Sequence, residues 1–244
     1  MIGTILGILA AIIAVLVALF KKKKPKPPVT NPPKPLPNGV HLTLISLTTQ
    51  AIPTDITAYL EAQQAQIDLD FSPAWGGSAV IDQSPGGWPV YLLDTSDVQN
   101  ALGYHDVDRS GIPYAKVFLQ TAKSVGVAWQ SVASHEVLEV LGDSNANTTD
   151  LGADGCQWVQ EVGDPVEDKS YTRLGVTLSD FVTPNWFTIG GSGPFDFLRV
   201  LTAPFTVTPG GYAIEVCNGQ TVTVGGNAEK SIDKLATVKR GYKR

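Results

Sequence analysis

The chain of 244 residues contains few residues with soft or nitrogen donor atoms: two cysteines, Cys156 and Cys217, and three histidines. Two cysteines exclude a cysteine-rich disulfide scaffold and any metal site built from four cysteines. The length is sufficient for one sizeable hydrophobic core. A metal site in this protein would therefore take several of its ligands from carboxylates.

Basic residues are scarce between residues 36 and 229. Of the 18 Lys and Arg residues, six lie in 21–34 and six in 230–244, so only six remain in 36–229, where 22 of the 23 acidic residues lie. The net charge of this region is −16. Nucleic-acid binding needs a basic surface, so no nucleic-acid partner is expected. The composition favours a domain that holds a cation.

Residues 2–20 contain no charge and no proline. A helix of this length, at about 1.5 Å per residue, matches the roughly 30 Å hydrocarbon core of a bilayer. The stretch lacks a basic start and runs into Lys21–Lys24, which predicts an uncleaved transmembrane anchor over 1–20 rather than a signal peptide or a buried core helix. Lysines directly after a span favour the cytoplasmic side. We therefore expect a single-pass membrane protein, bound to the lipid bilayer through residues 2–20, with a cytoplasmic C-terminal domain.

The remaining segments divide by composition. Residues 21–38 are rich in Lys and Pro and predict an extended linker, residues 39–229 form the predicted domain, and 230–244 predict a basic tail. With the domain in the cytoplasm, Cys156 and Cys217 are expected to be free thiols, and a disulfide would contradict that orientation.

Strand patterns precede a helical pattern within the domain. Alternating or apolar runs predict strands at 41–47, 78–82, 89–94 and 113–119. Residues 54–67 predict an amphipathic helix, and residues 127–142 predict a second helix with many apolar positions. Loops and short strands follow, so the sequence predicts an α+β fold with a mixed sheet.

The second predicted helix contains the pattern His-Glu-x-x-Glu. His135 and Glu139 are four residues apart, so on a helix they lie one turn apart on the same face and can bind one metal ion. Glu136, next to His135, would face the open coordination position. The pattern has the layout of the H-E-x-x-H zinc helix with Glu in place of the second His. Gly142 occupies the position of the glycine that ends the helix in the longer form of that pattern.

A zinc site of this type needs a third protein ligand and leaves one position for water. Apart from His135 the sequence offers only His41 and His105, so an oxygen ligand is expected. The acidic run that follows the helix supplies two candidates, Glu161 and Asp164, and the sequence does not decide between them. His105 is a candidate contact to a substrate carbonyl or transition state, or it packs in the core.

These features also have interpretations without chemistry. The helix could present a solvated acidic face, with His135 bonded to a carbonyl group. The acidic run at 161–168 could be a charged surface turn.

Five sequence blocks within residues 40–190 resemble, in the same order, bacterial and tailed-phage proteins similar to zinc metallopeptidases of the H-E-x-x-E type. The blocks are GYHD (103–106), PYAKVF (113–118), SHEVLE (134–139), EVGDPV (161–166) and VTLSDFVTPNWF (176–187). The resemblance implies a zincin-like domain, a mixed sheet with an active-site helix. It implies that His135 and Glu139 bind zinc, that Glu136 acts as the base and that the segment of Glu161 and Asp164 lies near the metal.

These features predict a membrane-anchored, metal-dependent peptidase with Zn²⁺ as cofactor and a peptide or protein as substrate. Glu136 would take a proton from a metal-activated water and deliver it to the leaving amine. The predicted strand 113–119 could hold an extended substrate by edge pairing. Two carboxylate ligands neutralise the charge of a divalent ion and weaken its pull on water, so such a site would be a slower hydrolase or would prefer a harder ion than zinc.

Two other function classes stay open. The first is a non-enzymatic, membrane- or virion-associated structural protein with a structural or vestigial metal site. The second is a carbohydrate hydrolase that uses Glu136 and a distant carboxylate as an acid/base pair, although no spacing in the sequence supports it.

Overall fold

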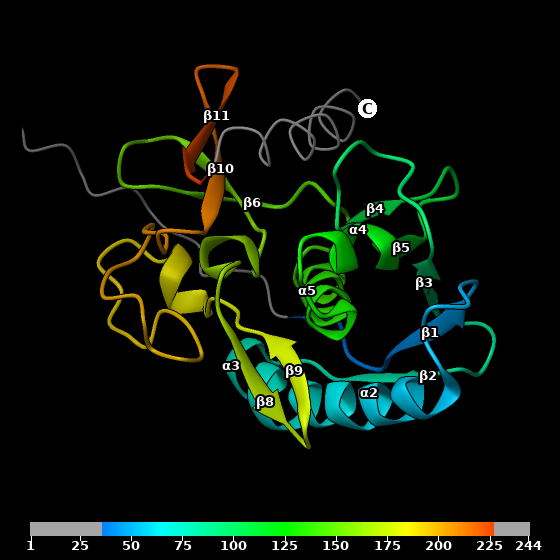
Figure 1. Ribbon diagram of the computed structural model, residues 1–244. Helices are drawn as coiled ribbons and strands as arrows, with labels where there is room; N and C mark the ends of the chain where they lie inside the picture. Colours follow the sequence, from blue (N-terminus) through cyan, green and yellow to red (C-terminus); the bar gives the residue numbers. More distant parts are fainter. Residues whose placement is uncertain (1–35, 227–244) are drawn as a thin grey trace, which may run out of the picture.

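A five-stranded sheet of mixed direction forms one half of the domain (Figure 1). The computed structural model describes residues 36–226, and the strand order in this sheet is β2-β1-β3-β5-β4. The pairs β1–β2, β1–β3 and β3–β5 are parallel, whereas β4 runs antiparallel to β5 at the edge of the sheet. The strands are β1 (Val40–Ser46), β2 (Ala79–Asp82), β3 (Trp88–Leu93), β4 (Gly103–Val107) and β5 (Pro113–Phe118).

The predicted α+β fold with a mixed sheet is confirmed, with one addition and one correction. Strand β4 has no counterpart among the predicted strands. The edge-pairing role expected for residues 113–119 is wrong, because β5 pairs with β3 on one side and with β4 on the other.

Two 14-residue helices, α2 (Pro53–Gln66) and α5 (Trp129–Gly142), provide most of the helical packing. Helix α5 packs against β4 and β5, and α2 packs against β2. Side chains of the strands alternate between buried and more exposed positions, and Leu42, Val90 and Val117 are completely buried. In Figure 1, α5 lies between the five-stranded sheet and the C-terminal half of the domain. The shorter helices are η1 (Ile67–Phe71, a π-helix), α3 (Ser72–Trp75) and α4 (Leu119–Ser124).

Helix α5 is covered on all sides. Every residue from Val132 to Leu141 is buried, and this run includes His135, Glu136 and Glu139. A helix that is buried all round belongs to the core of a domain. The alternative of a solvated acidic helix face therefore does not hold, and the polar side chains of α5 need partners inside the protein.

The C-terminal half is built from a second sheet and a hairpin. The sheet has the order β11-β10-β7-β6, and the hairpin pairs β8 with β9, which packs on α5. The elements are β6 (Thr149–Leu151), β7 (Gln157–Val159), η2 (Asp164–Val166), β8 (Ser170–Arg173), β9 (Val176–Ser179), η3 (Pro184–Phe187), β10 (Tyr212–Cys217) and β11 (Gln220–Gly225).

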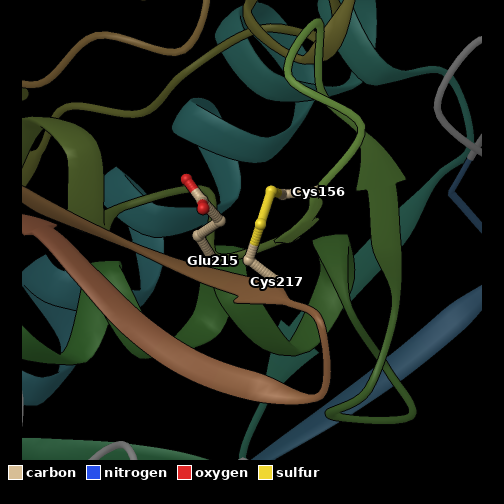
Figure 2. Close-up of side chains that lie close together, drawn as sticks. All are labelled: Cys156, Glu215 and Cys217. Carbon is tan, nitrogen blue, oxygen red and sulfur yellow. A yellow bond between two sulfur atoms is a disulfide. The ribbon is translucent and has the colours of Figure 1, made fainter.

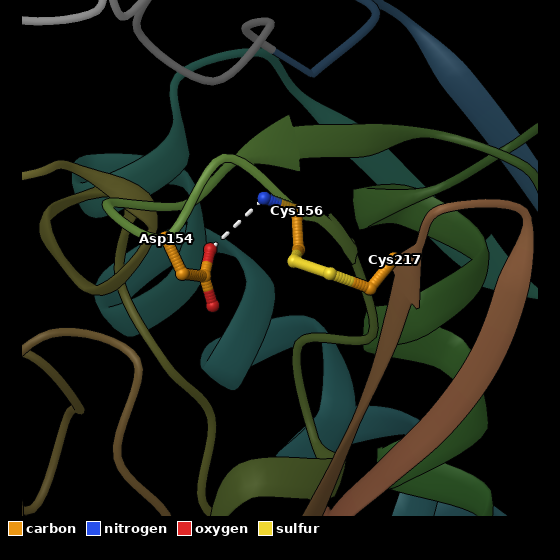
Figure 3. Close-up of a disulfide and its surroundings, with 3 residues drawn as sticks. All are labelled: Asp154, Cys156 and Cys217. Atoms are coloured by element: carbon orange, nitrogen blue, oxygen red, sulfur yellow. Dashed lines mark hydrogen bonds between the residues drawn. A yellow bond between two sulfur atoms is a disulfide. The ribbon is translucent and has the colours of Figure 1, made fainter.

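The two cysteines form a disulfide between Cys156, directly before β7, and Cys217, the last residue of β10 (Figure 3). The backbone N–H of Cys156 also donates to Asp154 Oδ1 at 3.0 Å. The expectation of free thiols is therefore wrong, and the disulfide argues against the cytoplasmic orientation from which that expectation came.

The prediction of a single-pass membrane protein is also corrected. Among residues 36–226, no helix is both long and apolar enough to cross a bilayer. At about 1.5 Å per residue, the 14-residue helices α2 and α5 fall well short of a roughly 30 Å hydrocarbon core. The stretch 2–20, on which the prediction rested, lies outside the described residues, as do most of the predicted linker 21–38 and the whole tail 230–244.

A buried hydrogen-bond network links α5 to α2 and β9. Gln66, the last residue of α2, accepts from Gln63 Nε2 at 2.9 Å and from Ser134 Oγ at 2.8 Å. Its amide nitrogen donates to Tyr171 Oη and to the carbonyl of Ser179. Ser134 Oγ in turn accepts the N–H of Ser179 at 3.1 Å. The residue next to His135 is thus fixed to α2 and β9.

Replacing Gln66 with leucine should destabilise the fold. The substitution removes the partners of the Ser134 hydroxyl and the Ser179 carbonyl in the interior, which costs about 1–3 kcal/mol. Denaturant unfolding of Gln66→Leu against the wild type measures the loss. The exposed Gln120→Leu is the matched control and should change stability by less than about 0.5 kcal/mol; equal stability of the two variants would contradict the role of the network.

A buried pair of carboxyl groups, Asp180 and Asp196, should make stability depend on pH. Burial and the neighbouring charge of Asp196 raise the pKa of Asp180 to about 7. The folded protein then keeps a proton that the unfolded chain loses near pH 4, so stability should fall as pH rises from about 4 to about 7 and level off above. Denaturant titrations across this range measure the slope. Asp180→Asn should flatten it, and an unchanged slope in this variant would refute the assignment.

Candidate metal centre

The predicted pair on α5 meets an acid from the C-terminal half. His135 Nε2 lies 2.9 Å from Glu139 Oε1 and 3.2 Å from Asp164 Oδ1, the first residue of η2. Each residue offers one ligand atom within 4.8 Å of the other two. Glu139 and Asp164 are completely buried, and His135 is 8% exposed. Of the two candidate third ligands, Asp164 is therefore the one placed beside His135.

Glu161 lies on the other side of Glu139, beside His105. His105 Nδ1, on the edge strand β4, is 3.3 Å from Glu139 Oε2 and 3.7 Å from Glu161 Oε2. His105, Glu136 and Glu139 form a second group whose ligand atoms lie within 4.8 Å of one another. All six predicted site residues are thus brought together, and His105 faces the predicted ligands rather than only packing in the core.

The donor set fits a divalent cation. Donor atoms that surround one ion at roughly 2.0–2.2 Å are separated from one another by roughly 3.0–3.5 Å. The separations from His135 to Glu139 and Asp164, 2.9 and 3.2 Å, match this spacing. Buried carboxylates need a compensating charge, and one imidazole with two carboxylates suits zinc or a harder divalent ion.

Acidic side chains surround His105. Burial alone would lower the pKa of His105, but the charge of Glu161, the hydrogen bond and charge of Glu139 and the charge of Asp143 outweigh it and raise this pKa to about 10. Asp143 follows α5 directly, and its carboxylate accepts both the N–H and the hydroxyl of Thr148.

Two glycines, which the sequence analysis did not identify as site residues, allow the backbone to pack directly against side chains of the centre. A Cβ at Gly163 would lie 2.5 Å from His135 Nδ1, and a Cβ at Gly103 would lie 2.7 Å from Glu136 Oε1. Only glycine permits backbone to approach these side chains so closely. Both stand in the blocks GYHD and EVGDPV, but a close approach between distant segments leaves no local signal in a single sequence.

A third group of residues of metal-binding types contains the disulfide. Cys156, Glu215 and Cys217 lie together, as Figure 2 shows. The two sulfur atoms are bonded to each other, so neither is available as a thiolate ligand. This group is therefore not a metal site in the disulfide-bonded protein.

A cavity of about 500 Å³ lies near the edge of the first sheet, apart from the centre. Its walls include Tyr114 and Lys116, which alternate along β5 with the fully buried Ala115 and Val117. Alternate residues of a strand face opposite sides of the sheet. None of the predicted site residues lines the cavity.

Comparison with known proteins adds no assignment, since no family model, curated protein or solved structure matches the chain. The resemblance to H-E-x-x-E metallopeptidases stays a prediction drawn from the sequence blocks. The function must therefore be argued from the geometry of the centre.

Removing Asp164 should impair metal binding. Loss of a direct ligand from a three-residue site should lower Zn²⁺ affinity by at least about 100-fold, more than the loss of an outer-shell partner. Competition of the metal-stripped full chain with a chromophoric chelator measures the affinity of Asp164→Ala. Glu167→Gln, from the same acidic run, should bind as the wild type does. Equal affinity of Asp164→Ala and the wild type would remove Asp164 from the ligand set.

Proposed function

We propose that this protein is a metal-dependent peptidase that hydrolyses peptide bonds with a water molecule activated by a divalent ion. The observation that carries the proposal is the buried group of His135, Glu139 and Asp164, whose donor separations suit one ion. Glu136 adjoins this group on the same helix. Zn²⁺ is the expected cofactor, and the carboxylate-rich set also suits a harder ion such as Mn²⁺.

Each residue has a defined task in this proposal. A bound divalent ion polarises a carbonyl group and lowers the pKa of a coordinated water. His135, Glu139 and Asp164 would hold the ion, and Glu136 would take a proton from the water and pass it to the leaving amine. The backbone of Gly103 fits against the Glu136 carboxylate and limits its movement. A general base held in place in this way is ready for proton transfer.

The edge strand offers a place for an extended substrate. Strand β4 pairs with β5 on one side only in the described part of the chain. It carries His105 in the middle, beside Glu139. A peptide that adds to the free edge by main-chain hydrogen bonds would run past the centre, and such pairing selects for extended peptides.

A second candidate is a non-enzymatic protein in which the ion has only a structural role. The depth of the centre favours it, because Glu136 is 2% exposed and Glu139 and Asp164 are fully buried. A substrate would need a path to residues that solvent barely reaches. Stoichiometric metal without hydrolysis of any peptide would support this candidate.

Glu136→Gln separates chemistry from metal binding. The amide keeps the shape of the side chain but cannot accept the proton, so hydrolysis should fall about 10²–10⁴-fold. Metal content should stay the same, since Glu136 is not among the three ligands. Fluorogenic peptide libraries and elemental analysis of the metal-loaded full chain measure the two quantities.

The matched control is Glu61→Gln, an exposed position on α2, which should leave hydrolysis unchanged. Hydrolysis that survives Glu136→Gln at the wild-type rate would refute the proposed base. A wild-type chain that binds no divalent ion would refute both the peptidase and the structural candidate.

A further inference from the structure

The second sheet places both cysteines and Glu215 on one face. In the antiparallel pairing of β7 with β10, Val216 lies opposite Gln157. One position further along, Cys156 comes opposite Cys217, where the disulfide joins them. Glu215 and Cys217 are two residues apart on β10, so their side chains point to the same face of the sheet. The strand pairing therefore holds the three side chains together in addition to the covalent bond.

The donor atoms of this group are spaced for one metal ion. The two sulfur atoms and one oxygen of Glu215 lie within 4.8 Å of one another (Figure 2). Around a tetrahedral zinc ion with Zn–S bonds of about 2.3 Å, two sulfur ligands are about 3.8 Å apart. Rotation of the two side chains can bring reduced sulfur atoms to this separation while the strands stay in place. Two thiolates and one carboxylate leave the fourth position of the ion for water.

The strands that carry the group have anchors of their own. Strand β10 pairs with β11 at six positions, the last of which is Cys217 opposite Gln220. On β7, Trp158 packs against the rings of Trp186 and Phe205, with centroids 5.8 and 5.2 Å away. These contacts do not involve the disulfide. We therefore expect the positions of the two cysteines to persist when the bond between them is cut.

The group is open to small molecules on one side. Cys217 and Glu215 are partly exposed, whereas Cys156 is 5% exposed. The exposed Asp154 accepts the N–H of Cys156 through its carboxylate (Figure 3), so a further negative charge stands close to the group. Access governs the rate of thiol–disulfide exchange. A reductant can thus reach the sulfur of Cys217, and a cation can follow it.

Reduction converts the disulfide into two ligands. The thiolate of a dithiol reductant attacks the sulfur of Cys217 and breaks the bond to Cys156, which leaves as a thiolate and takes up a proton. The second thiol of the reductant attacks the mixed disulfide, releases Cys217 and becomes part of a cyclic disulfide. The protein gains two electrons and two protons, which the reductant loses. Binding of a divalent ion to both thiolates then releases two protons to the solvent.

We propose that Cys156, Cys217 and Glu215 bind one Zn²⁺ ion when the disulfide is reduced. The ion links β7 to β10 in place of the disulfide, so the two strands are joined in both redox states. Soft thiolate ligands select zinc over magnesium or calcium. This site is separate from the candidate centre on α5, and it does not depend on the proposed peptidase activity.

Cobalt titration tests the proposal. Sulfur ligands give Co²⁺ a strong charge-transfer absorption in the near ultraviolet, which nitrogen and oxygen ligands do not give. The chain contains no other cysteine, so this band reports the site even if Co²⁺ also binds on α5. The full chain is reduced with a dithiol, desalted without oxygen and titrated. The reduced protein should develop the band with about one equivalent of sulfur-bound Co²⁺, and Zn²⁺ should abolish it. The disulfide-bonded protein should show no band.

Glu215→Gln separates the folded site from chelation by two thiols alone. The variant keeps both cysteines but loses the carboxylate ligand, so the affinity measured by the band should fall at least about 10-fold. Glu61→Gln, at an exposed position on α2, is the matched control and should bind as the wild type does. Circular dichroism of the reduced chain, with and without metal, shows whether the fold is retained.

Two results would overturn the proposal. One is a reduced wild type, folded or unfolded, that shows no charge-transfer band. The other is equal affinity of Glu215→Gln and the wild type, because the site would then not include the carboxylate. Either result would leave the centre on α5 and the proposed peptidase intact, and a centre on α5 that binds no metal would leave the cobalt band unchanged.

Discussion

Four acidic side chains share one buried space, where a carboxylate needs a compensating charge or hydrogen bonds. Helix α5 is enclosed by the first sheet on one side and by the C-terminal half on the other, and the ligands of the proposed centre come from both. Strand β4 supplies His105, α5 supplies His135, Glu136 and Glu139, and the segment around η2 supplies Glu161 and Asp164. The architecture thus encloses a space whose negative charge a cation can balance.

Neighbouring residues hold the side chains of the candidate centre in place. Gln66 holds the Ser134 hydroxyl behind the helix. Gly103 and Gly163 allow the neighbouring backbone to close on Glu136 and His135. A site whose side chains are fixed by hydrogen bonds and by close packing keeps its geometry without a large loss of entropy on binding.

The sequence predicted those parts of the fold that depend on local periodicity. Helical spacing placed His135 beside Glu139, because residues four apart lie on one face, and apolar patterning located α2, α5 and four of the five strands of the first sheet. The position of His105 depends on the antiparallel return of β4 beside β5, which no local pattern specifies. The apolar run 2–20 suggested a membrane span from length and composition alone, and the free thiols followed from that interpretation. Both expectations had to be corrected.

The disulfide has a consequence for the topology of the chain. Cys156 and Cys217 are 61 positions apart, and their bond closes a covalent ring that contains Glu161 and Asp164 but excludes His105 and His135. Such a ring lowers the conformational entropy of the unfolded chain. A metal ion bound by residues inside and outside this ring would link the ring to the rest of the polypeptide. The disulfide and the metal ion would then each limit the conformations open to residues 156–217.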